Sequence, residues 1–469
     1  MRRMILPFAG ALLALSGCNM APKYERPAEA LPGSLGAQAA PAQDLQSWWE
    51  LFGDARLNAL VERSMAENTS VLSAAARVRQ ARAALGMSNA DKWPGLTGSG
   101  AAQRKETPQF QLQPGATDPA NAFSLSAMLS YEVDLFGRVA NASAAARDDL
   151  AASSYAVESV RASIAAETVV TYYNLVAARE QLHITQRSVE TRRNTLKIQQ
   201  DRYAAGYGSE AERLQAEAEL ANAEVTIPDL LQRVESLKSA LRILTGATPE
   251  EIWTAADIAD TPAVLPQPPA VSLAVLPASL LERRPDVAAA EAQYRASVAR
   301  IGVAKAQRWP TLSLGAVLGS SDNEIGDLFS AASRTWTLSG SLSGPIYDFG
   351  RSAGRIESAE AAAEIAELNY IAVVRSAFKE LRDAQTSAEL SAQSVEARIQ
   401  QAAAWDRYLA ISTERYKTGY ADPLELLDAE RGQMAAHLAL VNARLNRVVA
   451  AANLCKALGG GWTPGADKK

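Results

Sequence analysis

The sequence predicts an α+β membrane protein in which a long-helix α-barrel continues into a transmembrane β-barrel shared between subunits. Three observations lead to this prediction. The chain begins with a processed-looking segment that contains a cysteine, it is internally duplicated, and each copy joins strand-like segments to a very long helical run. Because each chain supplies few strands, several chains must combine to close a barrel.

Composition argues against several classes of protein. The 469 residues are 48% hydrophobic and carry a net charge of -5, with scattered Lys and Arg, so no nucleic-acid partner is expected. His183 and His437 are far apart, and Cys18 and Cys455 suggest no disulfide framework. Phosphate-loop, H-E-x-x-H and G-x-S-x-G motifs are absent. We therefore expect no catalytic residues, no metal site, no cofactor and no enzyme activity.

The N-terminus has the pattern of a bacterial signal peptide. Arg2 and Arg3 precede an apolar stretch that ends at Leu15 and is too short to span a membrane. The residues from Leu15 to Cys18 resemble a lipobox, in which the cysteine is acylated and becomes the first mature residue. The resemblance also implies that Asn19, rather than Asp, after the cysteine favours localisation in the outer membrane over retention in the inner membrane. An ordinary signal peptide with an incidental cysteine is the alternative.

An internal repeat organises the rest of the chain. Three short motifs each occur twice, in the same order: Lys92-Trp93-Pro94 and Arg308-Trp309-Pro310, Phe136-Gly137-Arg138 and Phe349-Gly350-Arg351, Arg202-Tyr203 with Gly206-Tyr207 and Arg415-Tyr416 with Gly419-Tyr420. The predicted organisation is a signal peptide (1–17), a lipidated segment (18–53), a first repeat (54–245), a Pro-rich connector (246–285), a second repeat (286–458) and a tail (459–469).

Each repeat contains two segments with the alternation of a β-strand. Apolar residues alternate with polar ones over Phe123 to Val133, Leu312 to Leu318 and Trp336 to Ile346, and more weakly over Gly95 to Gln103. Strands of about ten residues with one apolar face suit a transmembrane barrel around water. A soluble hairpin with one face on a core would show the same pattern.

The other segments of each repeat are predicted to be helical. Arg138 to Ala205 and Arg355 to Thr418 lack Gly and Pro, and each would form a helix about 100 Å long. Residues spaced by seven predict a coiled-coil seam: Leu175, Leu182, Val189, Leu196 and Tyr203, and Ala388, Val395, Ala402, Leu409 and Tyr416. Shorter helices are expected over Asp54 to Ala90, Asp286 to Arg308 and Ser209 to Thr245.

Tight turns should follow the long helices. Gly206 and Gly419 are placed to end them as C-cap residues. Ser209 with Glu212, and Asp422 with Pro423 and Glu425, predict capping boxes for the return helices. These turns are expected to be the points farthest from the membrane.

The strand count predicts the oligomer. Four strands cannot close a barrel, and eight from two chains would make one filled by its own side chains. Twelve strands from three chains would leave an aqueous lumen. A homotrimer is therefore expected.

Several motifs together resemble the TolC-like outer-membrane efflux protein family, especially its lipoprotein branch. They are Trp48-Trp49 with Phe52, Asp54, Leu57 and Asn68; Leu280 to Val287 with Glu291; Ile301 to Ala304 before Trp309-Pro310; and Tyr347 to Arg351. The resemblance implies a trimer in outer-membrane lipid that docks onto a periplasmic adaptor (membrane fusion) protein and an inner-membrane resistance-nodulation-division pump. The implied function is a passive conduit for drugs or other small molecules. Trp replaces the commoner Phe before Pro94 and Pro310.

The resemblance also implies site residues. Leu424 and Asp428 match the family's constricting Leu and Asp, whereas the first repeat has Ala211 and Gln215 there. Both would form a periplasmic gate, with adaptor-facing tip turns at Gly206, Tyr207, Gly419 and Tyr420. Alternatively, Leu424 packs in the helix seam and Asp428 simply pairs with Arg431.

Two other functions compete with efflux. A channel for protein secretion can use the same architecture. A coiled-coil adhesin anchored by a barrel would gather its strands at one end of the chain, whereas here they lie inside each repeat. A passive duct needs no affinity pocket, so cargo selection is expected to reside in the pump.

Overall fold

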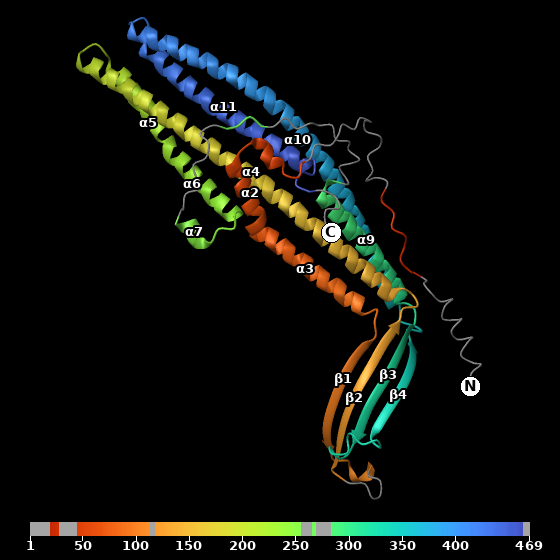
Figure 1. Ribbon diagram of the computed structural model, residues 1–469. Coiled ribbons are helices and arrows are strands. Elements are labelled where there is room, and N and C mark those ends of the chain that lie inside the picture. Colours follow the sequence, from red (N-terminus) through yellow and green to blue (C-terminus); the bar gives the residue numbers. More distant parts are fainter. Residues whose placement is uncertain (1–18, 28–44, 112–117, 255–264, 269–282, 463–469) are drawn as a thin grey trace. The chain divides into compact units, whose positions relative to one another are not determined.

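The computed structural model describes residues 19–27, 45–111, 118–254, 265–268 and 283–462. The chain divides into two compact units (Figure 1). Unit 1 contains the strands with adjoining parts of four helices, and unit 2 contains most of the helical residues. Within the described ranges, none of the helices carries an apolar stretch of the length needed to cross a bilayer.

Unit 1 contains a four-stranded antiparallel sheet in the order β1-β2-β3-β4. Its strands are β1 (Gly95–Lys105), β2 (Ala120–Val133), β3 (Thr311–Asp322) and β4 (Arg334–Ser343). The repeats meet at the β2–β3 pair, where Phe123 lies opposite Asp322 and Val133 opposite Leu312. Neither face of the sheet is buried within the chain, since β1 and β4 are exposed along their whole length.

The strand prediction was wrong at Ile346. Strand β4 ends at Ser343, because Gly344 packs against Pro310 and Pro345 has no N–H to donate to the ladder. The weak first strand proved to be as regular as the others and pairs with β2 from Gly95 to Lys105.

The two long helices are confirmed. Helix α4 (Arg138–Ala204) and helix α10 (Arg351–Lys417) each have 67 residues, so each is about 100 Å long at 1.5 Å per residue. Helix α10 begins four residues before the predicted start and accommodates Gly354 in its first turn.

The opening helix of the first repeat is not continuous, as had been expected for Asp54 to Ala90. It consists of α2 (Ala55–Glu67) and α3 (Thr69–Ala90), separated by Asn68 in an extended conformation. The Asn68 side chain donates to the Leu244 carbonyl oxygen and accepts from Ser70 N–H, which stabilises the break. The second repeat opens with α9 (Pro285–Ala306).

The return path of the first repeat is also divided, contrary to the single helix expected from Ser209 to Thr245. Helices α5 (Glu210–Glu224) and α6 (Thr226–Leu244) meet at Val225. Pro228 explains the interruption, because it cannot donate a helical hydrogen bond to the Glu224 carbonyl. The second repeat returns through one helix, α11 (Pro423–Ala457), and short helices cover Trp48–Phe52 (η2), Gln109–Gln111 (η3) and Pro249–Trp253 (α7).

Unit 2 has an apolar core centred on η2 and the middle of α4. Trp48, Phe52, Tyr172, Tyr173 and Leu175 belong to one buried cluster that also contains residues of α2, α6 and α11. Trp48 packs edge-on against both Trp49 and Phe52. The η2 residues, which precede the first repeat, therefore form part of this core.

The predicted seam is buried at five of its ten positions, among them Leu175. Val189, Val395, Ala402 and Tyr416 are buried, whereas Tyr203 is exposed. The guanidinium of Arg213 lies over the exposed Tyr203 ring, 5.9 Å from its centroid. The repeats have thus diverged at this pair of equivalent tyrosines.

Candidate functional site

The two predicted turns have the same backbone geometry. Gly206 and Gly419 have φ values of 80° and 81°, in the left-handed region that favours glycine. Tyr207 N–H donates to the Arg202 carbonyl oxygen at 2.9 Å, which satisfies a terminal carbonyl of α4. The equivalent bond joins Tyr420 N–H to the Arg415 carbonyl at 2.8 Å. These bonds give each long helix a Schellman-type end.

Aromatic side chains project from both turns. Tyr207 and Tyr420 are each 81% exposed. Burial of such large amphipathic side chains by another protein would be favourable. Exposed tyrosines next to conformationally fixed glycines are therefore suited to a protein contact.

Only the first return helix begins with the expected reciprocal capping box. Ser209 Oγ accepts from Glu212 N–H, and the Glu212 carboxylate accepts from Ser209 N–H. Asp422 caps α11 by accepting from Leu424 N–H. The predicted reciprocal hydrogen bond from Asp422 N–H to the Glu425 carboxylate is absent, because Glu425 instead accepts hydrogen bonds from Ser412 and Arg415 of α10.

The two candidate gate residues lie in the first turns of α11. Leu424 is 57% exposed, so it does not pack in the helix seam of its own chain. Asp428 accepts a hydrogen bond from Arg431 at 2.8 Å, as the alternative reading anticipated. Arg431 also lies 3.9 Å from Glu219 on α5.

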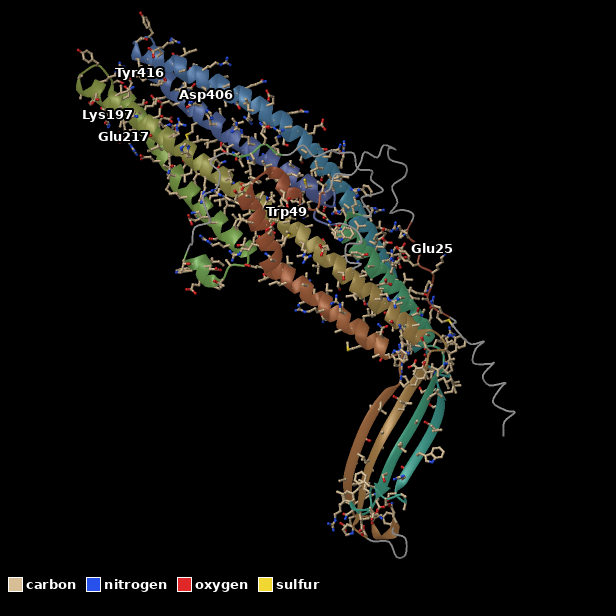
Figure 2. The ribbon with its side chains drawn as sticks, in the orientation of Figure 1. Glu25, Trp49, Lys197, Glu217, Asp406 and Tyr416 are labelled. Atoms are coloured by element: carbon tan, nitrogen blue, oxygen red, sulfur yellow. The ribbon has the colours of Figure 1, made fainter. Side chains whose placement is uncertain are left out.

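A polar layer beside these residues was not predicted. Gln199 Nε2 donates to the Tyr416 hydroxyl at 2.8 Å, and Thr195 donates to Glu430 at 2.8 Å. Figure 2 labels Tyr416 and Asp406, both on α10. The sequence does contain a signal for this layer, because polar residues recur every three or four positions along α4 and this spacing places them on one face of the helix.

Glu430 is the most constrained acid of this layer. Burial raises the pKa of its carboxyl, while the Thr195 hydrogen bond and the nearby Arg192 guanidinium oppose the rise. One carboxylate oxygen has no partner. A buried, incompletely paired acid makes this helix contact less favourable than an apolar seam of the same size.

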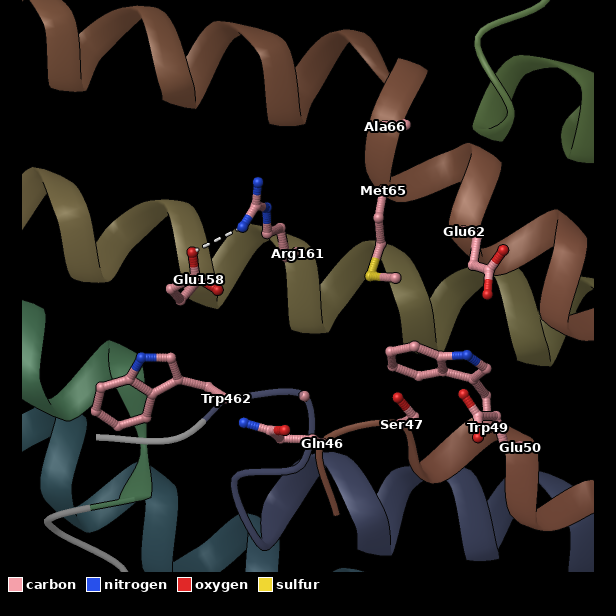
Figure 3. Close-up of a pocket in the computed structure, with 11 residues that line it drawn as sticks. Gln46, Ser47, Trp49, Glu50, Glu62, Met65, Ala66, Glu158, Arg161 and Trp462 are labelled. Carbon is pink, nitrogen blue, oxygen red and sulfur yellow. Dashed lines mark hydrogen bonds and ion pairs between the residues drawn. The ribbon is translucent and has the colours of Figure 1, made fainter. Parts of the chain in front are cut away.

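A separate cleft of about 610 Å³ lies elsewhere in unit 2 (Figure 3). Its lining comes from η2, α2, α4 and the residues after α11, and includes Trp49, Met65 and Trp462. Arg161 and Glu158 form an ion pair of 3.0 Å in its wall. In the part of the chain that the structure describes, no group of three His, Cys, Asp or Glu side chains could hold a metal ion.

Comparison with known proteins identifies the family. Residues 60–247 and 276–460 match the family model described as "Outer membrane efflux protein". The chain belongs to this family. OprJ of Pseudomonas aeruginosa is 30% identical over 465 residues, which cover 97% of this chain and 95% of OprJ. The cation efflux system protein CusC of Escherichia coli is 27% identical over 464 residues, covering 98% of both chains.

A solved structure agrees with this assignment. The open-state MtrE outer membrane channel of Neisseria gonorrhoeae superposes with a TM-score of 0.82 and 28% identity, covering 95% of this chain and 98% of MtrE. The α+β channel fold expected from the sequence is confirmed, as is the function of an outer-membrane efflux channel. This outer membrane efflux protein accordingly belongs to the bacterial outer membrane, and its relatives are named as outer membrane proteins of efflux systems or as outer membrane channels.

Proposed function

We propose that the protein works as a homotrimer in which three sheets close one barrel of twelve strands. The four-stranded sheet carries this proposal, because β1 and β4 each have only one neighbour in it. Unpaired strand edges are not tolerated in lipid. Pairing β4 of one chain with β1 of the next removes all such edges when the ring closes.

Exposed apolar residues on two different groups of helices support the same assembly. Leu214, Leu231 and Ile243 are exposed on α5 and α6, and Leu390, Ile399 and Ile411 are exposed on α10. Exposed apolar side chains on two different groups of helices suit a head-to-tail contact, which gives a ring when the rotation between subunits closes.

Detergent-solubilised protein should therefore have the mass of a trimer in native mass spectrometry. Arg substitutions at both Leu390 and Ile411 should increase the monomer fraction, because charges would replace exposed apolar contacts. Matching substitutions at the exposed polar residues Gln400 and Glu414 serve as the control. A stable wild-type monomer would contradict the shared barrel.

The tip turns are proposed to contact a periplasmic adaptor protein that connects the channel to a resistance-nodulation-division pump. The exposed Tyr207 and Tyr420 side chains support this role, because aromatic residues are enriched at protein interfaces. Drugs or other small molecules would then pass through the duct after selection by the pump.

A photo-cross-linking residue at position 207 or 420 should capture the adaptor in intact cells. The same residue at the exposed position 253, on α7, is the control for accidental capture. Equal capture from all three positions would argue against a specific tip contact, as would labelling of 207 and 420 by reagents confined to the outside of the cell.

Leu424 and Asp428 are proposed to narrow the tip as a ring of three leucines and three aspartates. The exposure of Leu424 supports this role, since none of the residues that the structure describes buries it. The pairing of Asp428 with Arg431 does not oppose it, because a carboxylate that is still 48% exposed can also face a lumen.

Cys18 lies outside the described residues, and its acylation is proposed from the lipobox resemblance. The mature N-terminal peptide should carry a lipid modification in mass spectrometry. Cys18→Ser should abolish that mass increase, while the shared barrel can still retain the protein in the membrane. A mature wild-type peptide with an unmodified cysteine would contradict the lipoprotein assignment.

A further inference from the structure

The segment Asn19–Pro27, here named the strap, lies along α9 in unit 1 and contains neither helix nor strand. Its principal contact is Glu291 of α9, whose side chain is only 9% exposed. Tyr24 donates its hydroxyl to Glu291 at 2.9 Å. Arg26 donates to both carboxylate oxygens, at 2.9 and 2.8 Å. A bidentate arginine fixes direction as well as position.

Residues of α9 complete this contact around Tyr24. Arg295 donates to Glu291 at 2.7 Å, and its guanidinium lies over the Tyr24 ring at 5.0 Å from the centroid. Tyr294 packs edge-on against the same ring, with 5.4 Å between centroids. The strap thus supplies one cation, one hydroxyl and one aromatic ring to a buried acid.

The carboxyl of Glu291 is held in its charged form. Burial alone would raise its pKa, but hydrogen bonds from Arg295, Arg26 and Tyr24 outweigh burial and the pKa is lowered. Removal of the strap would take away the hydrogen bonds from Tyr24 and Arg26 and leave the one from Arg295. Hydrogen bonds to an ionised, largely buried carboxylate are among the stronger ones. Strap and helix are therefore complementary in charge.

A second contact lies eleven residues farther along α9. A β-carbon on Gly302 would stand 2.7 Å from the Ala21 β-carbon and 2.6 Å from Asn141 Nδ2. Only glycine leaves room for the strap at this point. Because eleven helical residues rise about 16 Å, the two contacts fix both the position and the direction of the strap.

The direction of the strap limits where Cys18 can be. Ala21 lies at Gly302 and Tyr24 lies at Glu291, so the strap runs antiparallel to α9. Cys18 is three residues before Ala21, and three residues span at most about 11 Å. Gly302 is in the last turns of α9, and β3 begins soon after that helix ends.

We propose that Glu291 and Gly302 form a docking site for the lipidated strap, which holds the acyl anchor beside the start of β3. This role rests on the proposed acylation of Cys18. Docking would make the lipid and the sheet enter the same region of the membrane. Without docking, the lipid would be attached to a segment that makes no contact with α9.

Trypsin cleavage after Lys23 provides the test. Lys23 is exposed, whereas cleavage after Arg26 is blocked by Pro27. Protease action on a docked strap requires its release, so full-length wild-type trimer should lose residues 18–23 slowly. Glu291→Ala should accelerate this cleavage at least about tenfold, as expected for loss of a charge-assisted buried contact. Glu357→Gln, at an exposed acid of α10, should leave the rate unchanged.

Two further variants keep the result interpretable. Arg26→Gln changes only the strap and should also accelerate cleavage, even if Glu291→Ala fails to fold. Equal cleavage rates in wild type, Arg26→Gln and a folded Glu291→Ala would overturn the docking site.

Cys18→Ser should be cleaved as slowly as wild type, because docking of the strap does not require the lipid. Mass spectrometry of the peptide 18–23 reports acylation independently of the cleavage rate. A strap that resists trypsin but carries no lipid would reject the anchor role and leave the docking site standing.

Discussion

Simultaneous replacement of Leu424 and Asp428 by alanine should raise single-channel conductance several-fold in planar bilayers. In the proposed trimer, the change removes three apolar and three charged side chains from the narrowest part of the tip. Asp422 still caps α11 in this variant, and the core positions Leu426 and Leu427 are untouched. The trimer should therefore assemble normally.

Two controls separate gating from local helix chemistry. Arg431→Gln breaks the ion pair with Asp428 but retains the carboxylate, so its conductance should remain close to that of wild type. Gln215→Ala alters the equivalent position of the first repeat and should also have little effect. Unchanged conductance in a correctly assembled Leu424→Ala, Asp428→Ala trimer would locate the constriction elsewhere.

Trp48→Ala should destabilise unit 2 by about 3–5 kcal/mol, the usual cost of removing a large buried aromatic side chain. Trp48 is 1% exposed and belongs to the main apolar cluster. The loss should be measured as faster proteolysis and a lower melting temperature of the detergent-solubilised trimer.

Trp253→Ala is a matched control, because that indole is 89% exposed on α7. Its effect on the stability of the trimer should be within about 0.5 kcal/mol. A Trp48→Ala protein as resistant as the control would mean that η2 contributes little to the core, contrary to its burial.

Periodicity and helix punctuation were sufficient to predict most of the fold. Gly206 and Gly419 marked the ends of α4 and α10 because few other residues adopt a positive φ. The break at Asn68 could not be predicted in this way, since it depends on a hydrogen bond to Leu244, which is distant in sequence. The break at Val225 does have a signal in the sequence, because Pro228 cannot donate a helical hydrogen bond.

The candidate site was less accessible to sequence analysis. Leu424 and Asp428 are indicated by family resemblance alone, because a leucine and an aspartate four residues apart on a helix have no distinctive spacing. The bonds from Gln199 to Tyr416 and from Thr195 to Glu430 were missed because polar helix residues normally face solvent. Their pairing depends on how α4 packs against α10 and α11.

The interruption between α5 and α6 gives the two repeats different mechanical properties. An unbroken helix resists bending because its backbone hydrogen bonds are continuous. Helix α11 is unbroken over 35 residues. At Val225 the ladder is weakened, since Pro228 leaves the Glu224 carbonyl without its helical donor. A sideways force on the first helical hairpin would therefore bend it mainly at Val225. The second hairpin, which has no such interruption in α11, would bend less under the same force.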